Sequence, residues 1–264
     1  MRSSIVPEAK YGSPWSRDEL VLALYLYCQI PFAQTKANNP EVVKLASMLG
    51  RTPAAVARKL GNFGAFDEVL AERGVTGLTH VSKADSEVWA EFSSDWSCLV
   101  GRAQRLLAQA DSKEPLEEAD DSVIVRPPVE TEGARVVSVR LCQAFFRRAV
   151  LASYGVKCCV CGLDLRELLI ASHIVPWAAS EATRADPCNG LCLCALHDRA
   201  FDRGIMTVDP SDLTIRVGAR AIASRNAAVR SSLAELHHRR ILLPNRFAPA
   251  PECLAWHADN VYLG

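Results

Sequence analysis

The stretch that decides the fold is CCVCGLDLRELLIASHIVPWAASEATRADPCNGLCLCALHDRAFDRGIMTVD, residues 158–209. Within it, LIASHIVP predicts a strand that delivers His173 at a turn fixed by the following proline. NGLCLC predicts a second short strand that starts directly after Asn189, and ALHDRAFDRG predicts a helix that carries His197. The predicted order is strand, loop, strand and helix, with a histidine, an asparagine and a histidine in succession.

The same stretch holds six of the ten cysteines of the chain: Cys158, Cys159, Cys161, Cys188, Cys192 and Cys194. Such clustering favours one local site over scattered core thiols. The first twenty residues lack the apolar stretch of a secretory signal, so we expect a cytoplasmic protein, in which structural disulfides are rare. Cys158-x-x-Cys161 has the spacing of a zinc knuckle, and Cys194-x-x-His197 would complete a tetrahedral Cys₃His zinc site. Buried, reduced thiols that pack as small apolar groups are the alternative.

Composition limits the class of protein. The length of 264 residues predicts two modules, and 49% apolar with 23% charged residues is typical of soluble globular proteins. No run of 18 or more apolar residues occurs, so the sequence excludes a transmembrane helix. The net charge is zero, but residues 1–130 carry 14 Lys+Arg against 18 Asp+Glu, and residues 131–264 carry 16 against 12. The mildly basic second half permits a polyanionic partner without requiring one.

The amino-terminal part predicts helices. WSRDELVLALYLYCQI, residues 15–30, predicts a buried helix capped by Ser16, and two short helices follow that meet near Gly50. Thr52 and Pro53 suit the start of the second short helix. The pattern is typical of a helix-turn-helix whose second helix enters the DNA major groove, with candidate contacts from Arg51, Arg58, Lys59 and Asn62. A small helical domain with solvated charges is the alternative.

The middle of the chain predicts a boundary between the modules. Trp89, Phe92 and Trp96 are spaced by three and four residues, which indicates a buried helix face. Six acids lie between Asp111 and Asp121, and two prolines follow them, so residues 109–134 predict a linker with a short extended piece at 123–125. We therefore expect a helical DNA-binding domain at 1–108 and a second domain at 135–264, opened by an amphipathic helix over 136–153.

The motifs SHIVPW, NGLCLC and LHDRAFDRG, in this order, resemble the HNH endonucleases. That resemblance implies a ββα-metal motif, in which a β-hairpin and a helix hold a catalytic divalent ion. Over most of residues 15–209 the chain is similar to bacterial HNH proteins described as restriction endonucleases. The implied fold is α+β, with an amino-terminal winged-helix-like domain that docks double-stranded DNA and a carboxy-terminal HNH nuclease domain.

The resemblance also implies roles for single residues. His173 matches the general base, and an imidazole with a pKa near 6.5 can take a proton from water at neutral pH. Asn189 matches the residue that contacts the metal or fixes the loop, and His197 matches a metal ligand. Many family members place an acid or a second histidine where this chain has Ser172, so we expect Asn189, His197 and Asp202 to hold a Mg²⁺ or Mn²⁺ ion. The ion would neutralise the scissile phosphate and the leaving oxygen.

Two questions remain open from the sequence. His197 cannot serve the zinc and the catalytic ion together, so a catalytic His197 would leave Cys188 or Cys192 as the fourth zinc ligand.

The predicted activity is phosphodiester hydrolysis in restriction of foreign DNA, directed at unmodified or modified sites. If both strands are cut, we expect a homodimer. A nuclease acting on RNA or structured DNA, and a non-enzymatic, zinc-stabilised DNA-binding regulator, are the alternatives. The regulator would need none of His173, Asn189 and His197 in that order.

Overall fold

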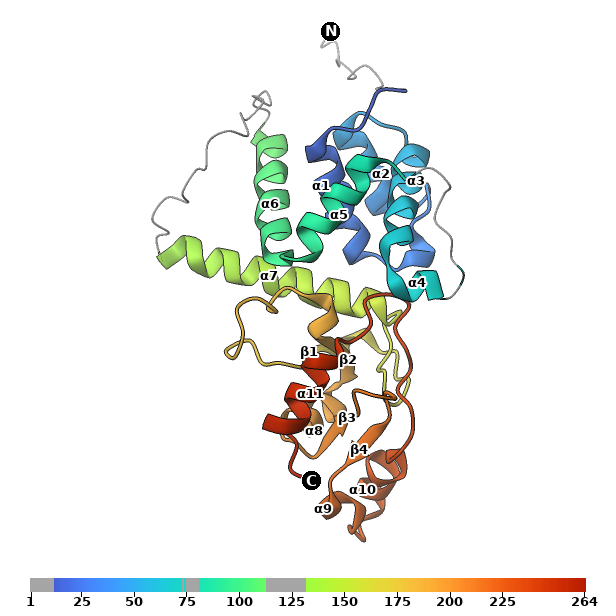
Figure 1. Ribbon diagram of the computed structural model, residues 1–264, viewed down its shortest axis with the longest axis vertical. Coiled ribbons are helices and arrows are strands. Elements are labelled where there is room, and N and C mark those ends of the chain that lie inside the picture. Colours follow the sequence, from blue (N-terminus) through green and yellow to red (C-terminus); the bar gives the residue numbers. More distant parts are fainter. Residues whose placement is uncertain (1–11, 73, 75–80, 113–131) are drawn as a thin grey trace.

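The protein is described here by a computed structural model that covers residues 12–72, 74, 81–112 and 132–264. Helices form the upper part in Figure 1, and two small β-hairpins with short helices form the lower part. The predicted α+β class is confirmed by this mixture. Each part has its own cluster of buried apolar side chains.

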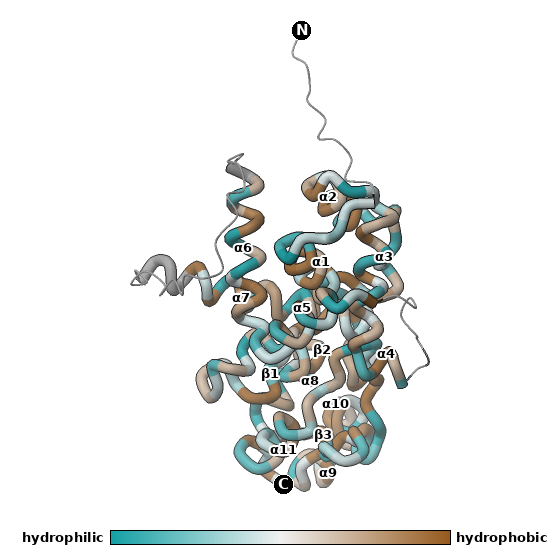
Figure 2. Tube along the Cα trace, turned by 45° about the horizontal axis from the view of Figure 1, so that its top comes forward, coloured by the Kyte–Doolittle hydropathy of each residue, from teal (hydrophilic) through white to brown (hydrophobic). Residues whose placement is uncertain are grey.

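Among the described residues, six α-helices make up the upper, helical unit. They are α1 (Arg17–Gln29), α2 (Pro40–Leu49), α3 (Pro53–Phe63), α4 (Glu68–Glu72), α5 (Lys83–Ser93) and α6 (Trp96–Ser112). α1 is the central helix and contacts α2, α3, α5 and α6. Ser16 and Glu19 form the capping box that starts α1, as the sequence predicts. In Figure 2, α6 alternates between hydrophilic and hydrophobic turns, as expected for a helix with one buried face.

The helix-turn-helix pattern forms as predicted. α2 ends at Gly50, whose φ of 64° is the left-handed conformation that glycine adopts without strain, and Thr52 caps α3. The described residues of the helical unit contain no strand, so the wing of the predicted winged helix is absent from them. Trp96 starts α6 rather than continuing α5, because Asp95 caps a new helix, but its side chain is buried as expected.

The long helix α7 (Glu132–Ser153) lies between the two units (Figure 1). Phe145 belongs to the buried cluster of the helical unit, and the adjacent Phe146 belongs to the cluster of the lower unit. Neighbouring helical residues point about 100° apart, so one helix can serve two cores. The interpretation of residues 136–153 as an amphipathic helix is confirmed: its buried residues serve both cores, and Arg147 and Arg148 lie on its exposed face.

The lower unit starts with an antiparallel hairpin of β1 (Leu169–His173) and β2 (Gly190–Cys194), followed by α8 (Ala195–Asp202). A second antiparallel pair, β3 (Met206–Val208) and β4 (Ile215–Val217), follows. The short helices α9 (Ala219–Ile222) and α10 (Ala227–Ser232) and the last helix α11 (Pro251–Asn260) complete the unit. The predicted strand, loop, strand and helix are thus all present at residues 169–202.

The carboxy-terminal segment ties the units together. Arg246 is fully buried, and its guanidinium donates hydrogen bonds to the carbonyl oxygens of Tyr27, Cys28 and Ile30 at the end of α1. Phe247 joins the apolar cluster of the helical unit. A helix end leaves its last carbonyls without partners inside the helix, so the arginine satisfies groups that would otherwise be buried unpaired.

The predicted boundaries at 108, 109–134 and 135–264 stay predictions. Residues 113–131, with the extended piece expected at 123–125, lie outside the described residues. Packing nevertheless crosses the predicted boundary, because α7 and Phe247 contribute to the helical core. No helix in the described part of the chain is long and apolar enough to cross a membrane.

Candidate active site and thiol cluster

The β1–β2 hairpin and α7 position the candidate site. His173 pairs with Gly190 across the hairpin. A Cβ atom on Gly190 would lie 2.3 Å from Cγ2 of Val150 and 3.0 Å from the ring of Phe146, both on α7. The close approach of α7 to the hairpin therefore requires glycine at this position. It also places α7 against His173.

His173 is held on three sides. Its ring stacks on Phe146 with centroids 3.6 Å apart, and the Trp177 ring is perpendicular to it with centroids 5.6 Å apart. Nε2 lies 3.0 Å from the carbonyl oxygen of Arg184, which can only accept, so Nε2 carries the proton and Nδ1 keeps a free lone pair. Burial lowers the pKa of His173, while the Arg184 carbonyl and the charge of Asp202 oppose that shift. The imidazole is thus neutral near pH 7 and has one nitrogen that can accept a proton.

Asn189 fixes the loop between the two strands. Its Oδ1 accepts from the Val175 amide at 2.8 Å, and its Nδ2 donates to the carbonyls of Val175 and Thr183. The side chain is fully buried and its oxygen faces the protein backbone. Of the two roles expected for Asn189, this geometry supports the loop-fixing one and places the side chain away from a metal.

Side-chain oxygens lie together instead where β1 contacts α8. Ser172 and Asp198 are neighbours: burial raises the pKa of the Asp198 carboxyl, and the Ser172 hydroxyl opposes that shift. Asp202 lies one helical turn further on α8 and is exposed. The Ser172 hydroxyl is buried without a hydrogen-bond partner among the described residues. Neither aspartate forms the surface ion pair with Arg199 or Arg203 that the sequence also allowed.

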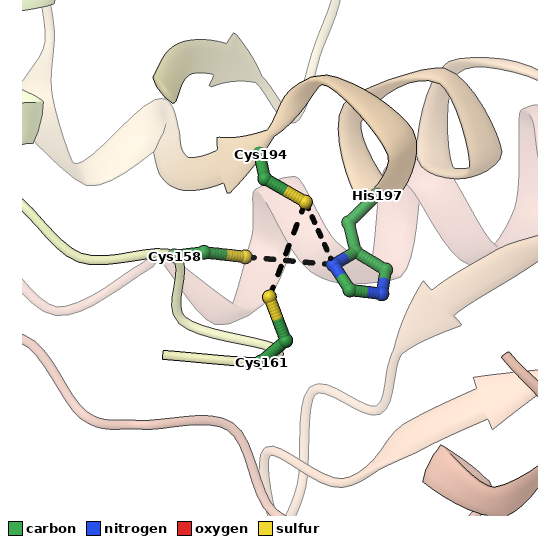
Figure 3. Close-up of side chains that lie close together, drawn as sticks. All are labelled: Cys158, Cys161, Cys194 and His197. Carbon is green, nitrogen blue, oxygen red and sulfur yellow. Dashed lines mark hydrogen bonds between the residues drawn. The ribbon is translucent and has the colours of Figure 1, made fainter. Parts of the chain in front are cut away.

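The structure moves His197 to a different cluster. Cys158, Cys161, Cys194 and His197 place their ligand atoms within 4.8 Å of one another (Figure 3). His197 Nδ1 lies 3.1 Å from the sulfur of Cys194 and 3.6 Å from that of Cys158, and the sulfurs of Cys161 and Cys194 are 4.0 Å apart. His197 therefore lies in the thiol cluster, which is one of the two places that the sequence left open for it.

The geometry of this cluster matches a tetrahedral zinc site. Zinc bonds of ~2.3 Å to sulfur and ~2.0 Å to nitrogen, at tetrahedral angles, place two sulfurs about 3.8 Å apart and a sulfur about 3.6 Å from the nitrogen. The second ring nitrogen of His197 lies 3.0 Å from the Ser232 carbonyl, which fixes Nδ1 as the ligand atom. Of the other cysteines in the stretch, Cys159 and Cys192 are buried and Cys188 is half-buried, and none belongs to the cluster.

The predicted DNA contacts of α3 are mostly buried. Arg51 pairs with Glu19, with 4% and 7% of the two side chains exposed, and its guanidinium lies over the Trp15 ring. Lys59 pairs with Asp85 at 2.7 Å, with 9% and 0% exposed, and Asn62 donates to the same carboxylate. Arg51, Lys59 and Asn62 therefore stabilise the helical unit and are not free to bind DNA. Of the four candidates only Arg58 is exposed.

A comparison with known families agrees with this site. Residues 158–209 match the model of the HNH endonuclease family (HNH_2). This segment of the chain is therefore similar to the HNH endonucleases. The match covers about a fifth of the chain and includes the hairpin, α8 and the thiol cluster. No curated protein matches the chain.

Sequence reasoning missed two contributors to the candidate site. Phe146 lies outside the matched segment, and only its place next to Phe145 in an amphipathic helix could have indicated that it packs on a second surface. Asp198 is absent from the ligands expected from the sequence. Its spacing of four from Asp202 was the available signal, because residues four apart share one face of a helix.

Proposed function

We propose that this chain is a metal-dependent DNA endonuclease that hydrolyses phosphodiester bonds and acts in the cytoplasm against foreign DNA. The observation that carries the proposal is His173, whose Nε2 is tied to a carbonyl and whose Nδ1 can accept a proton, with the charge of Asp202 acting on the same imidazole. In this mechanism Nδ1 takes a proton from the water that attacks the phosphorus. The stacked Phe146 and the fixed tautomer hold the imidazole in one orientation.

The residues near His173 suit a hard divalent ion. The carboxylates of Asp198 and Asp202 and the unpartnered hydroxyl of Ser172 are all oxygen donors, the ligand type that Mg²⁺ and Mn²⁺ prefer. Bound there, the ion would neutralise the charge that develops on the phosphate and the leaving oxygen. In this proposal Asp198 and Ser172, rather than His197 and Asn189, join Asp202 as ligands of the catalytic ion.

We propose a separate, structural Zn²⁺ for the thiol cluster. Cys158 and Cys161 come from the loop after α7, and Cys194 and His197 come from the junction of β2 and α8. Four protein ligands leave no open position, which is typical of structural rather than catalytic zinc. The zinc would fasten the start of α8, and with it Asp198 and Asp202, to the rest of the unit.

Double-stranded DNA is the substrate that we propose. Arg147 and Arg148 on α7 and Arg199 and Arg203 on α8 are exposed on the two helices that flank the hairpin. Guanidinium groups bind phosphates and supply affinity without base specificity. Reading of bases would then fall to the helical unit, where Arg58 and the outer face of α3 are the exposed part of the helix-turn-helix. Cutting both strands requires two active sites, so we propose a homodimer.

The test is nicking of a supercoiled plasmid by the purified full-length protein with Mg²⁺ or Mn²⁺ and with EDTA. We expect metal-dependent nicking that falls by roughly 10²- to 10⁴-fold in His173→Ala, the usual loss for one general base. His238→Asn is the matched control, because His238 is an exposed histidine with a φ of 64° that asparagine tolerates. Plasmids from methylating and non-methylating hosts then separate the two modes of restriction. Full activity of His173→Ala, or activity that persists in EDTA, would overturn the proposal.

A further inference from the structure

A cleft of about 640 Å³ lies between the two units, away from the thiol cluster and from His173. Its walls come from α4 and α5, from the loop before β2, from the β3–β4 turn and from the segment that precedes α11. In Figure 1 this last segment runs beside α4. The volume is in the range of pockets that bind small organic molecules.

Aromatic rings form one wall of the cleft. Phe66, Trp89 and Phe247 stack in series, with centroids 5.7 Å apart for the first pair and 6.3 Å for the second. The Trp96 ring is nearly perpendicular to the Phe247 ring, and their centroids are 5.5 Å apart. Ring faces attract ammonium groups through their quadrupole and contact methylene groups through dispersion.

Carboxylates also line the cleft. Asp67, Glu68, Asp186 and Glu252 line the cleft against one cation, the exposed Arg240. None of the four carboxylates has an ion pair within 4.0 Å among the described residues. Burial raises the pKa of the Asp186 carboxyl, hydrogen bonds from Cys188 oppose that shift, and the negative charge of Glu252, which lines the same cleft, adds to it.

Hydrogen bonds from backbone amides offset part of this negative charge. Asp67 accepts from the amides of Val69, Leu70 and Phe247, and the buried Arg246 behind the aromatic wall also offsets its charge. Asp186 accepts from the amide of Cys188. Counting both arginines, the cleft still has a formal excess of two negative charges, carried mainly by Asp186, Glu68 and Glu252.

We propose that this cleft binds a linear aliphatic di- or triamine. Its ammonium groups would face the carboxylates, and its methylene segments would lie against Phe66, Trp89 and Phe247. A single metal ion fits less well, because the described carboxylates of the cleft do not converge within 4.8 Å as ligands must. The negative excess repels a nucleic-acid phosphate, so the cleft is not a second DNA surface.

The experiment is titration calorimetry of spermidine into the full-length protein without DNA. We expect one site per chain, and roughly tenfold weaker binding by Glu68→Gln/Glu252→Gln, since two partly exposed ion pairs are lost. Both glutamates are exposed in the first turn of a helix, so this variant should fold. The matched control is Glu72→Gln/Glu235→Gln, which makes the same change in net charge at exposed positions outside the cleft.

Three results would overturn the proposal: no heat of binding, equal affinity in both double variants, or displacement of spermidine by Mg²⁺ at equal charge concentration. The last two would mean general attraction to acidic surface. A neutral diol of similar length should not bind, which isolates the contribution of the ammonium groups. Because the titration contains no DNA and measures no cleavage, its result is independent of the proposed nuclease activity.

Discussion

Replacing Lys59 by alanine should destabilise the helical unit and leave DNA binding by the folded protein unchanged. Lys59 donates to both oxygens of Asp85, at 2.7 and 2.9 Å, and Asp85 is fully buried. The variant would leave this carboxylate with only hydrogen bonds of 3.3 Å from Asn62 and from the Ser82 amide. Removing one partner of a buried ion pair costs about 3–5 kcal/mol.

That loss is large enough to measure. For a chain of this size 1 kcal/mol corresponds to a shift in melting temperature of about 2–4 °C, so Lys59→Ala should melt roughly 10 °C below wild type. Arg58→Ala is the matched control, because Arg58 is next to Lys59 in the sequence but its side chain is exposed. Most surface substitutions change stability by less than about 0.5 kcal/mol. Both are measured by calorimetry and by DNA affinity as a function of salt.

A different pattern would refute the reasoning. If Lys59→Ala melts like wild type while the slope of log affinity against log salt falls by about 0.9, Lys59 contacts a phosphate and the buried ion pair is not formed in solution. The double variant Lys59→Met/Asp85→Asn separates charge burial from packing. It should recover part of the lost stability, because no unpaired buried charge remains.

The remaining predictions concern the metal sites and pH. His197→Ala should lose about one equivalent of bound zinc and lower the melting temperature, whereas Asp198→Ala should keep the zinc and lose nicking; elemental analysis that finds zinc retained in His197→Ala would move this histidine out of the thiol cluster. Burial lowers the pKa of His257 to about 4. In the unfolded chain His257 has a pKa of about 6.5, so it binds a proton between about pH 6.5 and 4, whereas in the folded chain it stays neutral in this range. The free energy of unfolding therefore falls as pH drops from about 6.5 to 4, by up to about 3 kcal/mol. Unfolding of His257→Gln should depend less on pH in this window than wild type, and an equal dependence would assign the acid sensitivity to other groups.

Much of the local structure could be predicted because it depends on neighbouring residues. The capping box of Ser16 and Glu19, the cap at Thr52 and the glycine turn at Gly50 each involve residues within a few positions of one another. The β1–β2 hairpin was predictable for the same reason, since its apolar residues and turn signals are adjacent in the sequence.

The misassigned α3 residues show where local reasoning stops. Lys59 follows Val56 by three residues and precedes Phe63 by four, so helical periodicity places it on the buried face of α3. A lysine there needs a partner, and Asp85 lies 26 residues further along the chain. Without that partner, an outward, DNA-binding lysine was the simpler interpretation. The same holds for Arg51, whose partner Glu19 is 32 residues away.

The spacing Cys194-x-x-His197 did predict the Cys₃His cluster, and the structure resolves its conflict with the catalytic ion. Successive residues on a helix point about 100° apart, so His197 and Asp198 at the start of α8 cannot face the same ligand. His197 faces the thiols, and Asp198 faces Ser172 with Asp202 one turn later on its own side. Soft sulfur and imidazole donors thus lie on one side of α8 and hard oxygen donors on the other. Two ions of different chemistry can then be bound on two sides of the same helix without competing for ligands, and fixing one of them would hold the helix that positions the other.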